Sequence, residues 1–175
     1  MVDLIPFADI THLFREFQHT AWRLESRGAY AADLSSDRFR QFQQTGTLVN
    51  DPQNPWLANV NKQRALGKRF ERVRIVDDPL TENQRYLLAS ALGRPEDIRQ
   101  LPRAKAAELD LPTSDFWLFD SKILVTLHFD AEDRTLGVHV SEDANEVVGA
   151  CQVRDAAWHF ASPAEQFEAT VPSAV

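Results

Sequence analysis

His128 and His139 are the residues whose types and spacing come closest to a catalytic pair. Each lies in a segment that alternates like a β-strand, and the two segments follow one another in the chain. Asp120 and Asp130 bring carboxylates close to the imidazoles in sequence. A histidine beside a carboxylate is typical of general acid and base catalysis. One hypothesis is therefore a small hydrolase- or transferase-like enzyme that uses His128 or His139 with one of these carboxylates.

The segment that must position both histidines, residues 114–140, predicts a three-stranded antiparallel meander over 116–119, 122–129 and 135–140. If Asp120-Ser121 is a two-residue turn, Phe119 faces Lys122. The parity of the strands then predicts two faces. One is a core face with Leu118, Ile123, Val125, Leu127, Phe129, Leu136, Val138 and Val140. The other is a mixed face that includes Trp117, Phe119, His128 and His139. This mixed face is either a binding surface or a face half covered by a helix.

Other chemistry has weaker support in the sequence. Two histidines without a third ligand do not form a metal motif, so we expect neither a metal nor another cofactor. Cys151 occupies an apolar position within an expected helix, where an inert buried thiol is usual. No serine has the flanking glycines of a nucleophile elbow, and the glycines do not cluster into a phosphate loop.

The elements before the meander alternate between helices and strands. Apolar spacing predicts an amphipathic helix over 10–26, with Arg23, Glu25 and Tyr30 around its exit. Arg23 and Glu25 are either ligand contacts or, as we favour, a structural ion pair near the helix end. Capping signals predict further helices over 36–45, 55–67 and 81–93. Residues 70–76 alternate as a strand that directs Arg72 and Arg74 to one side, and residues 98–101 predict a second strand parallel to it.

A helix that begins after Asp143 and ends at Ser162-Pro163 closes the predicted fold. The expected class is α+β, with N-terminal helices packed on a small mixed sheet that ends in a three-stranded antiparallel meander and a C-terminal helix. We expect one domain over 1–163, with a helical part over 10–68 and a mixed-sheet part over 70–161. Residues 164–175 are expected to form a flexible tail.

Charge is distributed unevenly along the 175 residues. The net charge is −7, but residues 1–105 carry 16 Lys and Arg against 13 Asp and Glu, whereas residues 106–175 carry 3 against 13. A basic run over 62–74 is most simply a solvated face, and the acidic second part argues against direct nucleic-acid binding. A single cysteine and the lack of a leader or a long apolar stretch predict a cytoplasmic protein with no membrane contact.

Several motifs resemble those of a family of uncharacterised actinobacterial proteins. They are WRLESRGAY, NPW, RVRIVDDPLT, the pair Leu101-Pro102, and DLPTSDFWLFD followed by LHFD. The resemblance covers about residues 7–161, and FWLFD is its most specific element. Members of that family are often encoded beside helix-turn-helix transcriptional regulators. The resemblance therefore implies a role by association and no catalytic residues.

The order of elements is similar to half of a phospholipase-D-like fold, which some regulators use as a non-catalytic sensing domain. The catalytic pattern of that superfamily, a histidine with a lysine two residues later, does not follow any histidine of this chain. The likeness implies a sensor or a partner-binding version of the fold.

The preferred hypothesis is thus a non-catalytic cytoplasmic accessory module that binds a transcriptional regulator or a small ligand and modulates transcription indirectly. The candidate binding residues are Trp117, Phe119, Asp120, His128, His139, Arg23, Tyr30 and Arg74.

Overall fold

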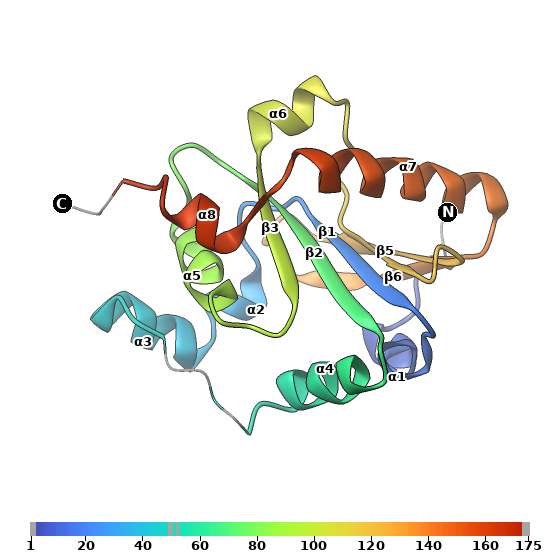
Figure 1. Cartoon of the computed structure of the whole chain (residues 1–175), viewed down its shortest axis with the longest axis horizontal. Coiled ribbons are helices and arrows are strands. Elements are labelled where there is room, and N and C mark those ends of the chain that lie inside the picture. Colours follow the sequence, from blue (N-terminus) through green and yellow to red (C-terminus); the bar gives the residue numbers. More distant parts are fainter. Residues whose placement is uncertain (1–2, 49–50, 52, 173–175) are drawn as a thin grey trace.

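A seven-stranded mixed sheet forms the centre of the molecule, with the strand order β6-β5-β4-β1-β2-β3-β7. The computed structural model describes residues 3–48, 51 and 53–172 (Figure 1). The strands are β1 (Thr20–Glu25), β2 (Arg69–Val76), β3 (Asp97–Pro102), β4 (Phe116–Phe119), β5 (Ile123–Phe129), β6 (Thr135–Ser141) and β7 (Ser162–Pro163). β1, β2 and β3 pair in parallel, and the other neighbours pair antiparallel. This arrangement confirms the α+β class.

Helices cover both faces of the sheet (Figure 1). They are η1 (Phe7–Ile10), α1 (Leu13–Glu16), α2 (Ala31–Leu34), α3 (Asp37–Thr45), α4 (Pro55–Ala65), α5 (Glu82–Ala91), α6 (Arg103–Glu108), α7 (Ala144–Phe160) and α8 (Ala164–Glu168). α6 and α7 pack on one face, which we call the α7 face, against Trp22, Val73 and Leu118. η1, α1 and α4 pack on the other, the α4 face, against Phe70 and Trp117.

Three predicted helix starts have the expected local chemistry. The side chain of Asn54 accepts hydrogen bonds from the first turn of α4, with Pro55 at the first helical position. Thr81 and Gln84 form a complete capping box at α5. The carboxylate of Asp143 caps α7. Each of these signals is local, so the sequence alone was sufficient to place the helix.

The helix predicted over 10–26 is wrong in its second half. Residues 7–16 do form the short helices η1 and α1, but residues 20–25 form β1 at the centre of the sheet. Ala21 and Leu24 fit a helical spacing, and they also fit a strand that is buried on both faces. Pairing with β2 and β4 decides between the two, and that pairing depends on residues far along the chain.

The register predicted for the meander is also wrong by one residue. The tight turn exists: Asp120 and Ser121 have φ angles of 52° and 53°, and the N–H of Lys122 donates to the carbonyl of Phe119 at 2.9 Å. However, Phe119 pairs with Ile123, and Lys122 is left out of the ladder. Because the connection has three residues instead of two, each side chain of β5 lies on the opposite face, relative to β4, from the one predicted.

This shift divides the predicted binding face between two sides of the sheet. Trp117 pairs with Val125, so both Trp117 and Phe119 lie on the α4 face with the core residues of β5. His128 and His139 lie together on the opposite face as diagonal neighbours, as predicted. The sheet therefore separates the two aromatic residues from the two histidines.

Residues 164–168, the first part of the expected tail, form the helix α8, which follows the short strand β7. β7 pairs antiparallel with β3, and α8 packs its buried Ala164 against Leu88 and Ile98. Residues 173–175 of the expected tail lie outside the described part of the chain.

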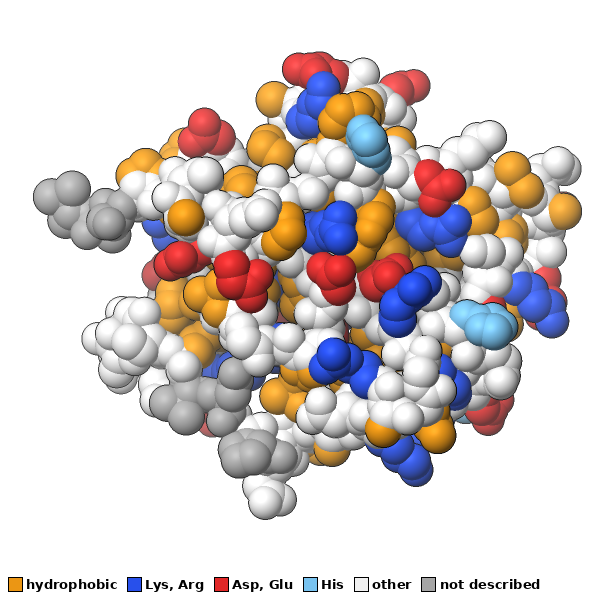
Figure 2. All heavy atoms as spheres, in the orientation of Figure 1, with side chains coloured by type: hydrophobic (Ala, Val, Ile, Leu, Met, Phe, Trp, Pro, Cys, Tyr) orange, Lys and Arg blue, Asp and Glu red, His pale blue; other side chains and the backbone are white. Residues whose placement is uncertain are grey.

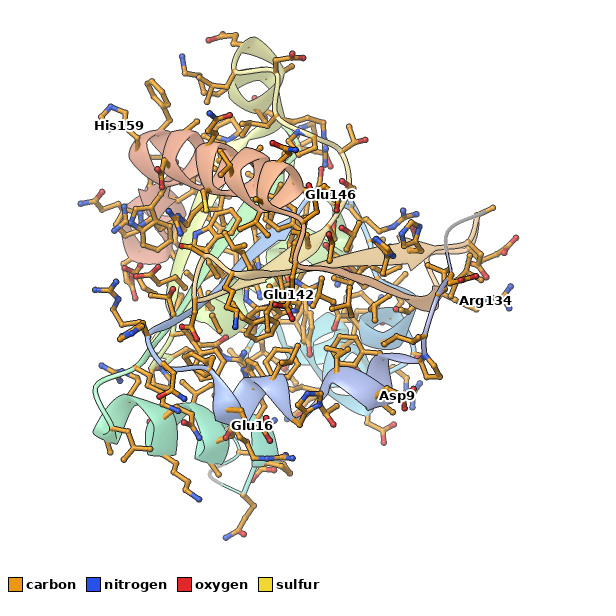
Figure 3. All side chains as sticks on the ribbon, turned by 90° about the vertical axis from the view of Figure 1, so that its right-hand side faces the viewer. Asp9, Glu16, Arg134, Glu142, Glu146 and His159 are labelled. Atoms are coloured by element: carbon orange, nitrogen blue, oxygen red, sulfur yellow. The ribbon has the colours of Figure 1, made fainter. Side chains whose placement is uncertain are left out.

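Charged side chains are mixed on the visible surface. On the face shown in Figure 2, Lys and Arg side chains alternate with Asp and Glu and form no continuous basic patch. Arg134 lies near the tip of the β5–β6 hairpin, which extends past the helices (Figure 3). Two members of the predicted basic run, Arg72 and Arg74, are instead largely buried beneath the α4 face.

Asp120 holds the hairpin turn against the segment that leads into β1. Its carboxylate accepts backbone N–H groups from Gln18 and His19 at 2.7 Å each and from Thr20 at 3.0 Å. Partial burial alone would raise the pKa of Asp120, but these three donors outweigh it and lower the pKa.

We predict that Asp120→Ala lowers the free energy of unfolding by about 2–3 kcal/mol at pH 7, because three backbone donors lose a charged acceptor. Since the folded-state pKa is depressed, this stabilisation is present above the ordinary Asp pKa of about 4 and is lost as the pH falls through the folded-state value. Urea unfolding at several pH values measures both effects. Asp155→Ala, which removes an exposed carboxylate on α7, is the control. An equal loss in both variants would contradict the anchoring role.

Candidate ligand pocket

A pocket of about 1090 Å³ opens on the α4 face, above the central strands β1, β2 and β4. Its walls come from η1, α1, α2, α4, α5 and the β5–β6 hairpin. The volume is slightly above the roughly 300–1,000 Å³ that is common for small-molecule sites. The charged lining residues are Arg15, Arg23, Arg72, Arg74, Arg94, Arg134, Glu25, Asp33 and Asp133.

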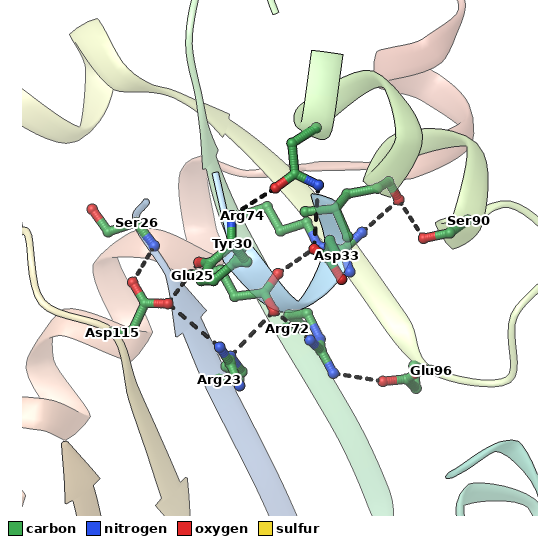
Figure 4. A network of polar contacts seen from close by, with 12 residues as sticks. Arg23, Glu25, Ser26, Tyr30, Asp33, Arg72, Arg74, Ser90, Glu96 and Asp115 are labelled. Atoms are coloured by element: carbon green, nitrogen blue, oxygen red, sulfur yellow. Dashed lines mark hydrogen bonds and ion pairs between the residues drawn. The ribbon is translucent and has the colours of Figure 1, made fainter. Parts of the chain in front are cut away.

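Glu25 is the common partner of three arginines at the floor of the pocket (Figure 4). Its carboxylate accepts from Arg72 and from Nε of Arg74, the latter at 2.5 Å. Nε of Arg23 lies 3.2 Å from the same carboxylate without forming a hydrogen bond. The side chain of Glu25 is only 7% exposed, so its charge depends on these guanidinium groups for compensation.

Two further carboxylates extend the network on either side. Asp115 lies 3.4 Å from Nη2 of Arg23 and accepts the hydroxyl of Tyr30 at 2.6 Å. Glu96 pairs with Nη2 of Arg72 at 3.0 Å and with Nη1 of Arg94 at 3.3 Å. The result is a continuous chain of alternating charges from β4 to the loop after α5.

The register of the parallel strands explains why these groups meet. β1 and β2 pair Arg23 with Arg72 and Glu25 with Arg74. All four side chains therefore point to the α4 face, while Val73 and Leu24 point to the α7 face. The alternation in the sequences WRLE and RVRIV is thus the local cause of the network.

Burial and neighbouring charge compete in setting the protonation of these groups. Burial alone would raise the pKa of Glu25, but Arg72, Arg74 and Arg23 together hold it well below its ordinary value. The pKa of Asp115 is raised because its desolvation outweighs Arg23 and its hydrogen bonds. Desolvation likewise raises the pKa of Asp33. Glu25 is therefore a fixed anion and not a proton donor or acceptor near neutral pH.

Aromatic rings line the pocket beside these charges. The rings of Phe14, Trp56 and Trp117 contact one another, with centroid distances of 4.9 to 6.0 Å. The guanidinium carbons of Arg23 and Arg72 lie 5.4 and 5.3 Å from the Trp117 ring. Such cation–π contacts favour a fixed orientation of both partners.

The rim of the pocket is joined to the hairpin tip. Arg27 forms an ion pair with Asp133, and its guanidinium carbon lies 4.7 Å from the centre of the Phe129 ring. The backbone N–H of Ala31 donates to the carbonyl of Asp133 at 3.2 Å. These contacts hold the tip against the start of α2.

Four of the predicted binding residues, Arg23, Tyr30, Arg74 and Trp117, line this pocket. The other four do not. Phe119 is buried in the core of the α4 face, and Asp120 anchors the hairpin turn. His128 and His139 lie on the α7 face, and neither imidazole hydrogen-bonds or pairs with a residue in the described part of the chain.

Sequence reasoning did not include several pocket residues among the candidates. The principal ones are Arg72, Arg94, Asp33 and Trp56. Glu25 was considered with Arg23 as a ligand contact or an ion pair, and the ion pair is present. For Arg72 a usable signal existed, because it lies two residues from the selected Arg74 on the same side of a strand. Arg94 and Asp33 lie in a loop and a short helix, and no periodicity marks them.

The described residues contain no group of three or more His, Cys, Asp or Glu side chains arranged to hold a metal ion. Among these residues, no helix is long and apolar enough to cross a membrane.

The family model described as Domain of unknown function (DUF6879) matches residues 8–169. The chain belongs to this family. No curated protein matches the sequence.

Two solved structures have a similar fold. NucT from Helicobacter pylori has a TM-score of 0.55 and 8% identity, over 93% of this chain and 97% of that chain. Nuc from Salmonella typhimurium, a phospholipase D family member, has a TM-score of 0.52 and 7% identity, over 89% of this chain and 88% of that chain. At these identities the likeness concerns the fold alone, and it agrees with the likeness inferred from the order of elements.

We predict that Glu25→Gln lowers the free energy of unfolding by about 3–5 kcal/mol, because three largely buried arginines lose their shared anion. Chemical denaturation measures the loss. Glu71→Gln is the matched control on β2, since Glu71 is less buried and pairs with the exposed Arg69. It should cost less than about 1 kcal/mol. A loss below about 1 kcal/mol for Glu25→Gln would show that the network is not organised by this carboxylate.

Proposed function

We propose that this protein is a non-catalytic module that binds a small ligand in the pocket above Glu25. The observation that carries the proposal is the pocket itself. Its floor is a network of buried ion pairs, and its walls are aromatic rings that pack against one another. Sites for small molecules typically combine such apolar walls with a few fixed polar groups.

The residues present argue against the enzyme hypothesis. The predicted acid and base, His128 and His139, lie on the other side of the sheet from the pocket. Glu25 stays ionised between its arginines, so it is poorly suited to proton transfer. The histidine–lysine pattern of phospholipase-D-like enzymes does not occur in the sequence.

The proposed role is regulatory and indirect. The resemblance to actinobacterial proteins encoded beside helix-turn-helix regulators suggests such a regulator as the partner. Direct binding to nucleic acid is disfavoured by the interspersed charges on the surface in Figure 2. We place this activity in the cytoplasm, where a lone thiol such as Cys151 remains reduced.

Ala32 offers a way to block the pocket without disturbing the core, because it lines the pocket on α2 and is exposed to solvent. We predict that small molecules from a metabolite collection raise the melting temperature of the wild type and that Ala32→Trp abolishes the shift. Ala169→Trp, at an exposed position after α8, should behave like the wild type. Thermal unfolding with each compound is the measurement.

The same variants test the regulatory role. A tagged wild-type chain expressed in its native cell should co-purify a helix-turn-helix regulator, and Ala32→Trp should change the amount recovered while Ala169→Trp does not. If compounds stabilise the wild type and Ala32→Trp equally, the pocket is not the ligand site. Recovery of no regulator with folded protein would contradict the stable-partner role.

A further inference from the structure

Among the described residues that line the pocket, the buried side-chain polar groups without a hydrogen-bond partner are all donors. Four buried N–H groups of lining residues have no hydrogen-bond acceptor within the described chain: Nε of Arg23, Arg72 and Arg94, and Nε1 of Trp117. No buried side-chain oxygen of a described lining residue is without a donor. A buried donor without an acceptor costs free energy, so these groups favour a ligand that supplies acceptors and negative charge.

Charge at the pocket surface points the same way. Among the described lining residues, six arginines face three carboxylates. One of the three, Glu25, is already shared by three guanidinium groups, and another, Asp133, is paired with Arg27 from outside the lining. The remaining carboxylate, Asp33, accepts from the amide of Asn83 at 3.2 Å. Carboxylates outside the lining compensate part of this positive charge: Glu96 pairs with Arg72 and Arg94, Asp115 with Arg23, and Asp130 and Glu132 with Arg134. A modest excess of positive charge remains at the lining, and the N–H groups without acceptors are the stronger indication that the ligand supplies acceptors.

The aromatic side chains of the pocket walls favour a ligand that contains a flat apolar ring system. Trp117 and Trp56 lie edge-on to Phe14, and Tyr30 lies edge-on to Phe129, with ring centroids 5.9 Å apart. The guanidinium carbon of Arg23 lies near both aromatic groups, 5.4 Å from the centre of the Trp117 ring and 6.0 Å from that of Tyr30. An aromatic ring that enters here would contact ring edges and the faces of arginines.

We propose that the ligand class is an aromatic anion, a molecule with a planar ring system that carries one acidic group; this inference rests on the ligand-binding function proposed above. The acidic group lies near Arg94 and Arg23, and the rings lie against Trp117 and its aromatic neighbours. Asp33 repels the acidic group and so limits its affinity.

Three probes separate the two parts of this recognition. 8-Anilinonaphthalene-1-sulfonate carries both rings and an acidic group, N-phenyl-1-naphthylamine has the same rings without the acidic group, and inorganic sulfate has the charge without the rings. The first should bind the folded protein at least about ten-fold more tightly than either of the others, which corresponds to one well-placed interaction. Fluorescence titration measures the two dyes, and sulfate is measured by competition.

Two variants, one that removes a positive charge and one that removes a negative charge, distinguish recognition of the acidic group from a general structural effect. Arg94→Gln should weaken binding of the sulfonate dye about five-fold, and Asp33→Asn should strengthen it by a similar factor. Neither should change binding of the neutral dye. Arg99→Gln, which alters an arginine on the α7 side that stacks on Trp158, is the control and should leave all three probes unaffected. Ala32→Trp should abolish binding of both dyes.

The outcomes separate this inference from the function on which it rests. Equal binding of the neutral and anionic dyes would overturn the charge requirement, and equal binding of sulfate would overturn the aromatic one. If none of the probes binds but other compounds stabilise the protein in a manner that Ala32→Trp abolishes, the ligand class is wrong and the pocket function stands. If no compound of any class binds, both proposals fail.

Discussion

The carboxylate of Glu25 is the shared partner of arginines on two adjacent parallel strands, β1 and β2. A largely buried carboxylate is tolerated only when its partners are close and hydrogen-bonded, and here Arg72 and Arg74 of β2 and Arg23 of β1 supply that compensation. The arginines depend on Glu25 in the same way. This mutual dependence fixes the side-chain positions at the centre of the α4 face, and the pocket lies directly above them.

The network also explains why this face of the sheet is not closed by a helix across its middle. Hydrophobic packing occupies one end of the α4 face, where α1 and α4 cover Phe70 and Phe119, and α5 and α8 cover Ile98 at the other end. Between them the floor is charged, and an apolar helix there would offer no acceptor to the Nε–H groups of Arg23 and Arg72, which have none within the described chain. An open pocket with aromatic walls is consistent with this constraint. On the α7 face, α6 and α7 instead pack against an apolar cluster that includes Trp22, Val73 and Leu118.

The sequence correctly predicted the helices whose first turn is stabilised by neighbouring residues. The capping box at Thr81, the Asn54-Pro55 start and the Asp143 cap each involve residues within one turn, and all three helices were placed correctly. β1 was missed because its pairing with Arg69–Val76 and Phe116–Phe119 spans tens of residues. One unpaired residue, Lys122, was enough to place Trp117 and His128 on opposite faces. The pocket was recovered only in part, since its lining combines the strands β1, β2 and β4, several helices and the β5–β6 hairpin, which no single pattern connects.

The protonation state of Glu25 is the most direct test of this account. In a sample with ¹³C-labelled glutamate, the Glu25 side-chain carboxyl resonance can be followed as the pH is lowered while the protein stays folded. The account predicts that this resonance does not titrate near the ordinary Glu value of 4.5 and stays that of a carboxylate to a much lower pH. Titration within about one pH unit of 4.5 would mean that the arginines do not hold the carboxylate, and it would contradict the organisation of the pocket proposed here.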